Sequence, residues 1–323
     1  MRFAGFATRD RQTVAGEPAR MVPSLMQTVE VRRLTTTQTP ASSRRLGRLN
    51  RQFGVGQEVY TMTIDAQEIV TSIGMGVADA FATNRLFLGV DVDAFQNADI
   101  HPEYVTTVEV AKRLTAPDRQ VSLEAHMKEL RKQARSLSWM ALGGNKAVLP
   151  GIDSTLAPYQ FGKKDSQRLD ILVRLADALQ PPLLIVEAKL GIRNLPGVIQ
   201  DIERIVRLLD MYKALGLLDK YTVYGAAVFH SMEAGNDTGA AGAKAQMLLQ
   251  GVQTHLASVV AARSWLKAKA ELLQHGAITQ PVIGYTEHYD DGSSEAVFAK
   301  DSFHFAPGLV LLGNANDVTT AKF

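Results

Sequence analysis

The chain has 323 residues, of which 46% are apolar and 21% charged, and this balance is typical of a globular rather than a disordered protein. It contains no cysteine, which excludes disulfide bonds and thiolate metal sites. The first residues lack the apolar core of a signal peptide, and no window resembles a membrane-spanning helix. We therefore expect a cytoplasmic protein that is long enough for two domains.

The net charge of +2 is unevenly distributed along the chain. The first 60 residues contain ten Lys and Arg against four Asp and Glu, and the segment "SSRRLGRLNRQFG" has no acid. Such a segment suits contact with phosphates, although a solvated arm without a partner would look the same. The arginines predicted to contact phosphates are Arg44, Arg45, Arg48 and Arg51.

Residues 1–55 show little periodicity, and we expect loops and extended structure there. The segment "DAQEIVTSIGMGVADAFATNRLF" predicts a helix that begins at Asp65, because Asp65 is a good N-cap and apolar residues recur every four positions after it. Gly74 and Gly76 lie inside this helix and indicate close packing against a neighbour.

The next segment predicts a short helix over Thr107–Leu114, a turn, a basic amphipathic helix from about Ser122, and a hairpin around Gly143–Asn145. This order resembles a winged helix-turn-helix module, in which the second helix enters the major groove and the hairpin is the wing. An ordinary pair of antiparallel helices with a polar outer face is the alternative. The residues predicted to contact DNA here are Arg119, Gln120, Ser122, His126 and Arg131.

Pro150-Gly151 suggests a domain boundary, which gives domains 1–152 and 153–323. Two apolar strands, a helix with a wide apolar face and a further strand follow in that order, which predicts a βαβ unit. We expect an α+β or α/β protein, with a winged-helix N-terminal domain and a C-terminal mixed sheet flanked by helices. The C-terminal elements are predicted over strands 167–175 and 183–189, helix 195–216, strand 221–230, helix 243–274 and strands 281–289, 295–299 and 304–313.

The two apolar strands carry ionisable residues at one end. If they pair across the turn at Pro181-Pro182, Asp170 lies opposite about Ala188 and next to Glu187 and Lys189. Two carboxylates with the Ala188 carbonyl between them form an all-oxygen site, which suits Mg²⁺. Lys189 would stabilise an attacking hydroxide or the charged phosphorane. A structural ion pair between Lys189 and Glu187 at the sheet edge is the alternative.

The pattern Asp170-x16-Glu187-Ala-Lys189 on a hairpin followed by a helix resembles the PD-(D/E)XK nucleases. The resemblance implies a mixed sheet flanked by helices and Mg²⁺-dependent cleavage of phosphodiesters. It assigns Asp170 and Glu187 as metal ligands and Lys189 as the catalytic lysine, with Leu169 in place of the family's proline. Asp153 and Asp165 remain alternatives for the first ligand.

Family members often carry further polar residues near this site. Gln200 and Asp201 are the candidates on the following helix, and Glu124 and Glu129 are candidates on an upstream helix.

The whole chain resembles a type II restriction endonuclease of this family. That likeness implies a homodimer that cuts duplex DNA at a palindromic site, CCTGCAGG. No nucleotide-binding motif occurs, so no nucleotide cofactor is expected. The alternatives are a structure-specific or repair nuclease of the same family and a non-catalytic winged-helix regulator.

Overall fold

The computed structural model describes residues 64–88, 102–163, 167–176, 179–188, 195–235, 240–273 and 278–323. All of them belong to one unit, Val59–Phe323. In chain order the elements are α1 (Ala66–Leu88), α3 (Pro102–Leu114), β1 (Arg119–His126), α4 (Met127–Ala141), the 3-10 helix η1 (Lys146–Val148), α5 (Leu149–Leu156), β2 (Arg168–Leu175), β3 (Leu184–Ala188), α6 (Leu195–Ala214), β4 (Tyr224–Gly235), α7 (Ala240–Ala261), β5 (Lys267–Leu272), β6 (Ile278–His288), β7 (Ser294–Gly313) and the 3-10 helix η3 (Asn316–Thr319).

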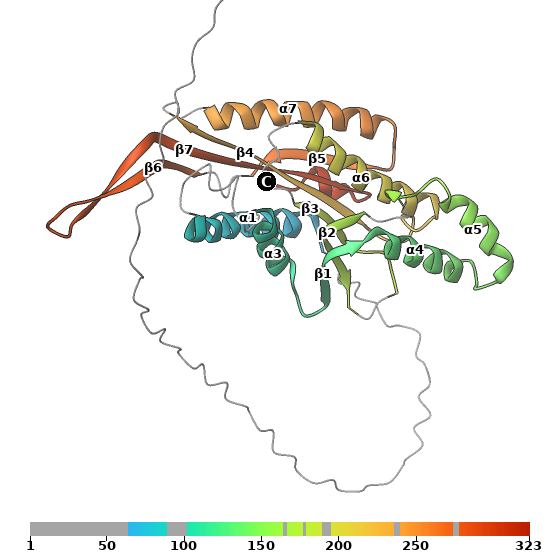
Figure 1. The fold of residues 1–323 in the computed structure, drawn as a ribbon. Coiled ribbons are helices and arrows are strands. Elements are labelled where there is room, and N and C mark those ends of the chain that lie inside the picture. Colours follow the sequence, from blue (N-terminus) through green and yellow to red (C-terminus); the bar gives the residue numbers. More distant parts are fainter. Residues whose placement is uncertain are drawn as a thin grey trace, which may run out of the picture. The chain divides into compact units, whose positions relative to one another are not determined.

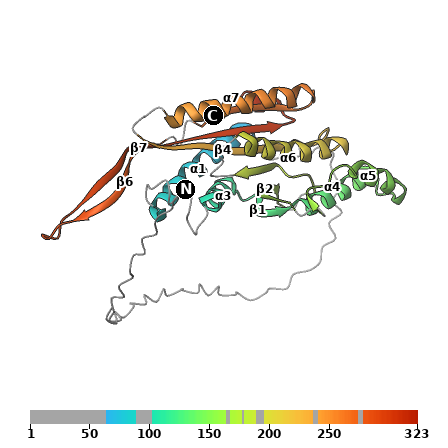
Figure 2. The ribbon, with the colours of Figure 1, turned by 45° about the horizontal axis from the view of Figure 1, so that its top comes forward.

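The described strands form a mixed sheet in the order β1-β2-β3-β4-β7-β5, with β6 paired to β7. Strand β2 pairs antiparallel with β1 and with β3, whereas β3 and β4 are parallel and are connected through α6. Figures 1 and 2 show α6 and α7 over one face of the sheet and α1 and α3 over the other. The prediction of a mixed sheet flanked by helices is therefore confirmed.

Each face of the sheet has its own hydrophobic core. Leu172 and Ile185 point to the face covered by α6, where they join Ile202 and Ile205 in one cluster. Ile171 and Val186 point to the opposite face and pack in the cluster that includes α1 and α3. Both faces of β2 and β3 are buried, which explains why these strands read as continuous apolar runs.

Helix α1 begins as the sequence predicts. The backbone amide of Glu68 donates a hydrogen bond to the Asp65 carboxylate over 2.7 Å, so Asp65 is an N-cap. Gly76 marks a close helix contact, because a Cβ atom there would lie 2.5 Å from the Cα of Val110 on α3. At Gly74 the nearest atom would be a side-chain carbon of Leu273 at 3.8 Å, which is an ordinary contact.

The predicted basic helix is found, with Met127, Leu130 and Ala134 buried as expected, but its predicted start near Ser122 is wrong. Residues 119–126 form β1, which pairs antiparallel with β2, and α4 begins at Met127. The alternation of Val121, Leu123 and Ala125 fits a strand, and pairing with β2 outweighs the helical spacing seen in the sequence.

The prediction of a hairpin around Gly143–Asn145 is also wrong. The chain turns there and continues into η1 and α5, with the side chain of Asn145 accepting a hydrogen bond from the amide of Ala147 over 2.9 Å. Pro150 lies in the first turn of α5, where its missing N–H costs nothing.

These two corrections change the interpretation of the N-terminal half. The order expected for a winged helix-turn-helix is not found between Pro102 and Leu156, because a strand separates α3 from α4 and a helix replaces the wing. The boundary predicted after residue 152 falls inside α5, within the unit Val59–Phe323.

The predicted helix over 243–274 ends early, at Ala261. Residues 267–272 form β5, which pairs with β7. Lys267, Lys269 and Glu271 alternate with apolar residues, so the segment fits the sheet despite the helix propensity of Ala, Lys and Glu.

The C-terminal segment after β7 fastens α1 to the sheet. The carboxylate of Asp317 accepts hydrogen bonds from the backbone amide of Ala66 over 3.0 Å and from the hydroxyl of Tyr224 over 2.7 Å. Ala66 lies in the first turn of α1 and Tyr224 at the start of β4, so one carboxylate joins three elements.

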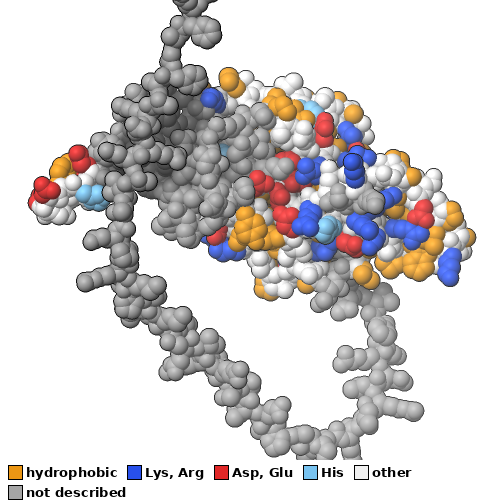
Figure 3. All heavy atoms as spheres, viewed as in Figure 1, with side chains coloured by type: hydrophobic (Ala, Val, Ile, Leu, Met, Phe, Trp, Pro, Cys, Tyr) orange, Lys and Arg blue, Asp and Glu red, His pale blue; other side chains and the backbone are white. Residues whose placement is uncertain are grey.

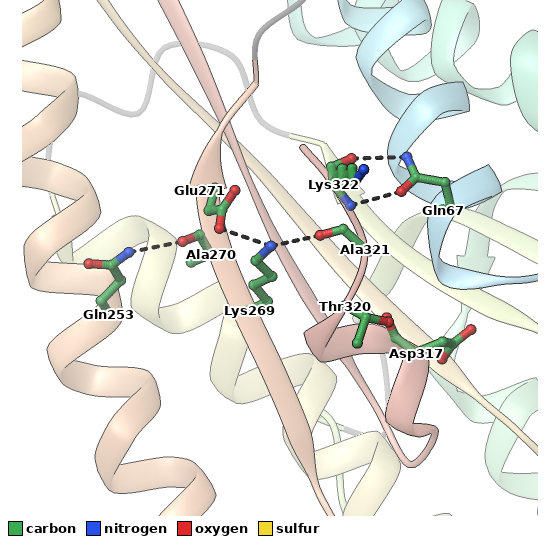
Figure 4. Close-up of polar contacts among 9 residues, drawn as sticks. All are labelled: Gln67, Gln253, Lys269, Ala270, Glu271, Asp317, Thr320, Ala321 and Lys322. Atoms are coloured by element: carbon green, nitrogen blue, oxygen red, sulfur yellow. Dashed lines mark hydrogen bonds and ion pairs between the residues drawn. The ribbon is translucent and has the colours of Figure 1, made fainter.

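The last residues continue this attachment (Figure 4). Gln67 exchanges two hydrogen bonds with the backbone of Lys322, of 2.9 and 2.8 Å. The ammonium group of Lys269 on β5 donates to the carbonyl of Ala321 over 2.6 Å and lies 5.2 Å from the ring centre of Phe323. The C-terminal segment is therefore part of the folded core.

Candidate active site

The β2–β3 hairpin brings Asp170 and Glu187 together. The observed register pairs Ile171 with Val186 and Leu172 with Ile185, so Asp170 and Glu187 are the residues directly beyond the last backbone pair. The sequence prediction placed Asp170 opposite about Ala188, one residue away. Glu187 belongs to the face that α6 covers, because Arg204 of α6 contacts it, and Asp170 lies close enough for its charge to act on Glu187.

Asp170 is half-buried and bonded to the neighbouring strand. Its Oδ2 atom accepts a hydrogen bond from the backbone amide of Ala188, with 2.7 Å between the atoms. A carboxylate that accepts a backbone N–H is held in one orientation. The first acid of the pattern is therefore fixed beside the residue that follows the second.

Glu187 is one of the few buried charged side chains among the described residues, with 1% of its surface exposed. The guanidinium of Arg204 donates a hydrogen bond to its Oε1 over 2.6 Å. Its other oxygen, Oε2, is buried and has no hydrogen-bond partner among the described residues. Burial raises the pKa of Glu187 to about 8, with the charges of Asp170 and Asp201 acting in the same direction and Arg204 opposing them.

Helix α6 adds two charged side chains. Asp201 is buried, and Arg204 follows it by three residues, with 3.4 Å between their Oδ1 and Nη2 atoms. Residues three apart lie on one side of a helix, which explains why both face Glu187. Of the two polar candidates on this helix, Asp201 therefore joins the cluster, whereas Gln200 is exposed.

The sequence reasoning missed Arg204. The signal that could have found it is its spacing from Asp201, because a polar pair on the apolar face of an amphipathic helix has to meet buried partners.

Lys189 lies outside the described residues, so its position relative to the two carboxylates stays a prediction. Asp165, one alternative first ligand, also lies outside them. Asp153, the other alternative, is exposed on α5 and forms an ion pair with Arg135 instead of joining Glu187.

The two upstream glutamates do not lie in the cluster. Glu124 is exposed on β1, with its carboxylate 3.7 Å from Arg168, and Glu129 is exposed on α4, where it pairs with Lys132. Both side chains therefore lie at the surface.

The donor atoms fit a hard divalent cation. Asp170, Glu187 and the Ala188 carbonyl offer oxygen, and the buried Oε2 of Glu187 is an acceptor without a donor. As the side chains stand, no group of three or more His, Cys, Asp or Glu residues within the described ranges is arranged to hold a metal ion. The carboxylates are instead arranged around the guanidinium of Arg204.

The residues predicted to bind DNA fall into three groups. Arg44, Arg45, Arg48 and Arg51 lie outside the described residues. Two others are engaged within the protein: Arg119 forms a two-pronged ion pair with Glu68, and Arg131 donates to the carbonyl of Leu156 over 3.1 Å. Three remain accessible at the sheet edge, with Gln120 and His126 exposed and Ser122 partly exposed on β1.

Comparison with known proteins adds no information about the site. No family model, curated protein or solved structure matches the chain. Among the helices that the structure describes, none has the length and apolar character needed to cross a bilayer.

Proposed function

We propose that the protein is a Mg²⁺-dependent endonuclease that hydrolyses phosphodiester bonds in duplex DNA. The observation that carries the proposal is that Asp170 and Glu187 lie near each other at the end of two buried strands, with Oε2 of Glu187 buried and without a donor among the described residues. Burying carboxylates is costly, and Arg204 bonds only one oxygen of Glu187, so the remaining buried oxygen is available to a metal ion.

Each residue has a distinct role in the proposed reaction. Asp170, Glu187 and the Ala188 carbonyl would hold Mg²⁺, which when bound lowers the pKa of a water and offsets phosphate charge. Lys189 would stabilise the attacking hydroxide or the charge on the phosphorane. The Ala188 amide holds the half-buried Asp170 beside the strand that carries Glu187.

The substrate is proposed to be a specific palindromic duplex site, cut by a homodimer. This part of the proposal rests on the likeness of the chain to type II restriction endonucleases, which implies CCTGCAGG. The surface supports contact with a polyanion, because Lys and Arg side chains gather over α4 and the adjoining end of α6 (Figure 3). The exposed basic residues of β2 and α4 include Lys128, Lys132 and Arg168.

A structure-specific or repair nuclease of the same family is the second candidate. One finding favours it: α3, β1 and α4 belong to the same unit as the candidate site instead of forming a separate reading module. A nuclease that reads DNA structure needs no such module.

The test is incubation of the full chain with long duplex DNA, in Mg²⁺ and in EDTA. Discrete fragments in Mg²⁺ alone are expected, and a duplex with one CCTGCAGG site would be cut while its scrambled control stays intact. A smear, or preference for branched DNA, would favour the repair nuclease. Sequence-specific binding without cutting would favour a non-catalytic regulator.

A further inference from the structure

The carboxylate cluster already contains a cation, which is the guanidinium of Arg204. It donates to Oε1 of Glu187 over 2.6 Å and lies 3.4 Å from Oδ1 of Asp201. The negative charge of Asp170 also attracts it. Two carboxylates therefore contact the guanidinium and a third lies near enough to act on its charge, so acids outnumber bases in the cluster.

The geometry places Arg204 where it can both hold and release Glu187. Its side chain is 19% exposed, whereas those of Glu187 and Asp201 are 1% and 3% exposed. The arginine therefore reaches the buried acids from the solvent side, and a long flexible side chain can move without disturbing the strand.

We propose that Arg204 is the resident counter-ion of this cluster and that a divalent cation competes with it for Glu187. The inference rests on the proposed function, because it takes Asp170 and Glu187 as the metal ligands. A guanidinium and a metal ion that share one carboxylate repel each other, and on this proposal the repulsion outweighs the help that Arg204 gives by orienting Glu187. Arg204 thus stabilises the metal-free fold and keeps metal affinity low.

The test is titration of the full chain with Mn²⁺ alone, without DNA, followed by calorimetry. The Arg204→Gln variant is expected to bind Mn²⁺ at least roughly tenfold more tightly than the wild type, because the competing charge is gone. The matched control is Arg207→Gln, which removes the same charge one turn further along α6. Arg207 lies over the ring of Phe161 and donates to the carbonyl of Pro158, away from the cluster, so its variant should bind Mn²⁺ like the wild type.

Equal or weaker Mn²⁺ binding by a folded Arg204→Gln variant would overturn the inference. If that variant does not fold, the comparison moves to Asp201→Asn/Arg204→Gln, which removes one charge of each sign from the cluster. This double variant should still bind Mn²⁺ more tightly than the wild type, because the group that occupies Oε1 of Glu187 is absent, and equal or weaker binding would again refute the competition.

The cleavage assay separates the two proposals. If Arg204→Gln binds Mn²⁺ more tightly but the wild type cuts no DNA, the inference about Arg204 is supported and the proposed nuclease activity is refuted. If the wild type cuts DNA and Arg204→Gln binds Mn²⁺ with unchanged affinity, the proposed nuclease activity is supported and the inference about Arg204 is refuted.

Discussion

The carboxylate of Asp170 on β2 accepts a hydrogen bond from the backbone amide of Ala188 on β3, with 2.7 Å between Oδ2 and the amide nitrogen. This bond links the first acid of the candidate site to the residue between Glu187 and Lys189. It fixes the relative position of β2 and β3 at a point where the backbone pairing of the two strands has ended.

Substitution at this hairpin should separate catalysis from folding. Asp170→Asn keeps an acceptor for the Ala188 amide but loses a metal ligand, and Lys189→Ala removes the group proposed to stabilise the reacting charge. We expect each variant to cut DNA about 10²–10⁴-fold more slowly and to keep DNA binding in a gel-shift assay. Asp153→Asn, an exposed acid on α5, should cut normally. Normal cutting by Lys189→Ala would show that the active site is assigned wrongly.

The pKa of Glu187 predicts how stability depends on pH in the absence of metal. Burial raises this pKa from its ordinary value of 4.5 to about 8, so between about pH 5 and 8 the unfolded chain loses a proton that the folded protein retains. The free energy of unfolding is therefore largest below pH 4.5 with respect to this group. It should fall by on the order of 4 kcal/mol by pH 8.

Urea unfolding in EDTA at several pH values measures this dependence. Glu187→Gln has no titrating group at the position, so its stability relative to the wild type should rise between pH 5 and 8. A constant difference between the two proteins over this range would show that Glu187 does not titrate there.

The two glycines of α1 should respond oppositely to alanine. A Cβ at Gly76 would collide with the backbone of Val110, which cannot move without separating α1 from α3. We expect Gly76→Ala to lower the free energy of unfolding by about 1–3 kcal/mol. Gly74→Ala meets an ordinary contact and should raise it by about 0.5–1 kcal/mol, because alanine favours the helix. Equal effects of the two variants in thermal melts would contradict the close packing at Gly76.

Asp317 should contribute more to stability than its position near the C-terminus suggests. Asp317→Ala removes the acceptor for both the Ala66 amide and the Tyr224 hydroxyl, and a loss of about 2 kcal/mol is expected in chemical unfolding. Asp290→Ala, at an exposed turn between β6 and β7, is the comparison and should stay within about 0.5 kcal/mol of the wild type. If Asp317→Ala lowered the free energy of unfolding no more than Asp290→Ala does, the C-terminal segment would not be needed to hold α1 in place.

Binding of phosphates by the N-terminal arginines predicts a change in salt dependence. Replacing Arg44, Arg45, Arg48 and Arg51 together by Gln should reduce the slope of log affinity against log salt by roughly 0.9 for each phosphate that an arginine had neutralised. Arg119→Gln is the contrast, because Arg119 is paired with Glu68, so it should lower stability and leave the slope unchanged. Fluorescence anisotropy with a duplex at several salt concentrations measures both. An unchanged slope in the fourfold variant would indicate an arm without a DNA partner.

The sequence alone was sufficient for the features that depend on local patterns. Continuous apolar runs around Asp170 and Glu187 predicted two buried strands, and the wide apolar face of residues 195–216 predicted α6, which ends at Ala214. A segment whose apolar residues recur with the period of a helix or a strand, and which begins with a capping residue such as Asp65, can be predicted from its own sequence.

Tertiary structure decided what depends on partners distant in the sequence. Residues 119–126 and 267–272 form strands because β2 and β7 supply their hydrogen bonds, and helix propensity could not reveal those partners. The spacing of Arg204 from Asp201 puts both on one face of α6, but only the way α6 crosses the sheet places that face against Glu187. The sequence therefore determined which carboxylates lie at the end of the hairpin, whereas the packing of α6 decided which cation faces them.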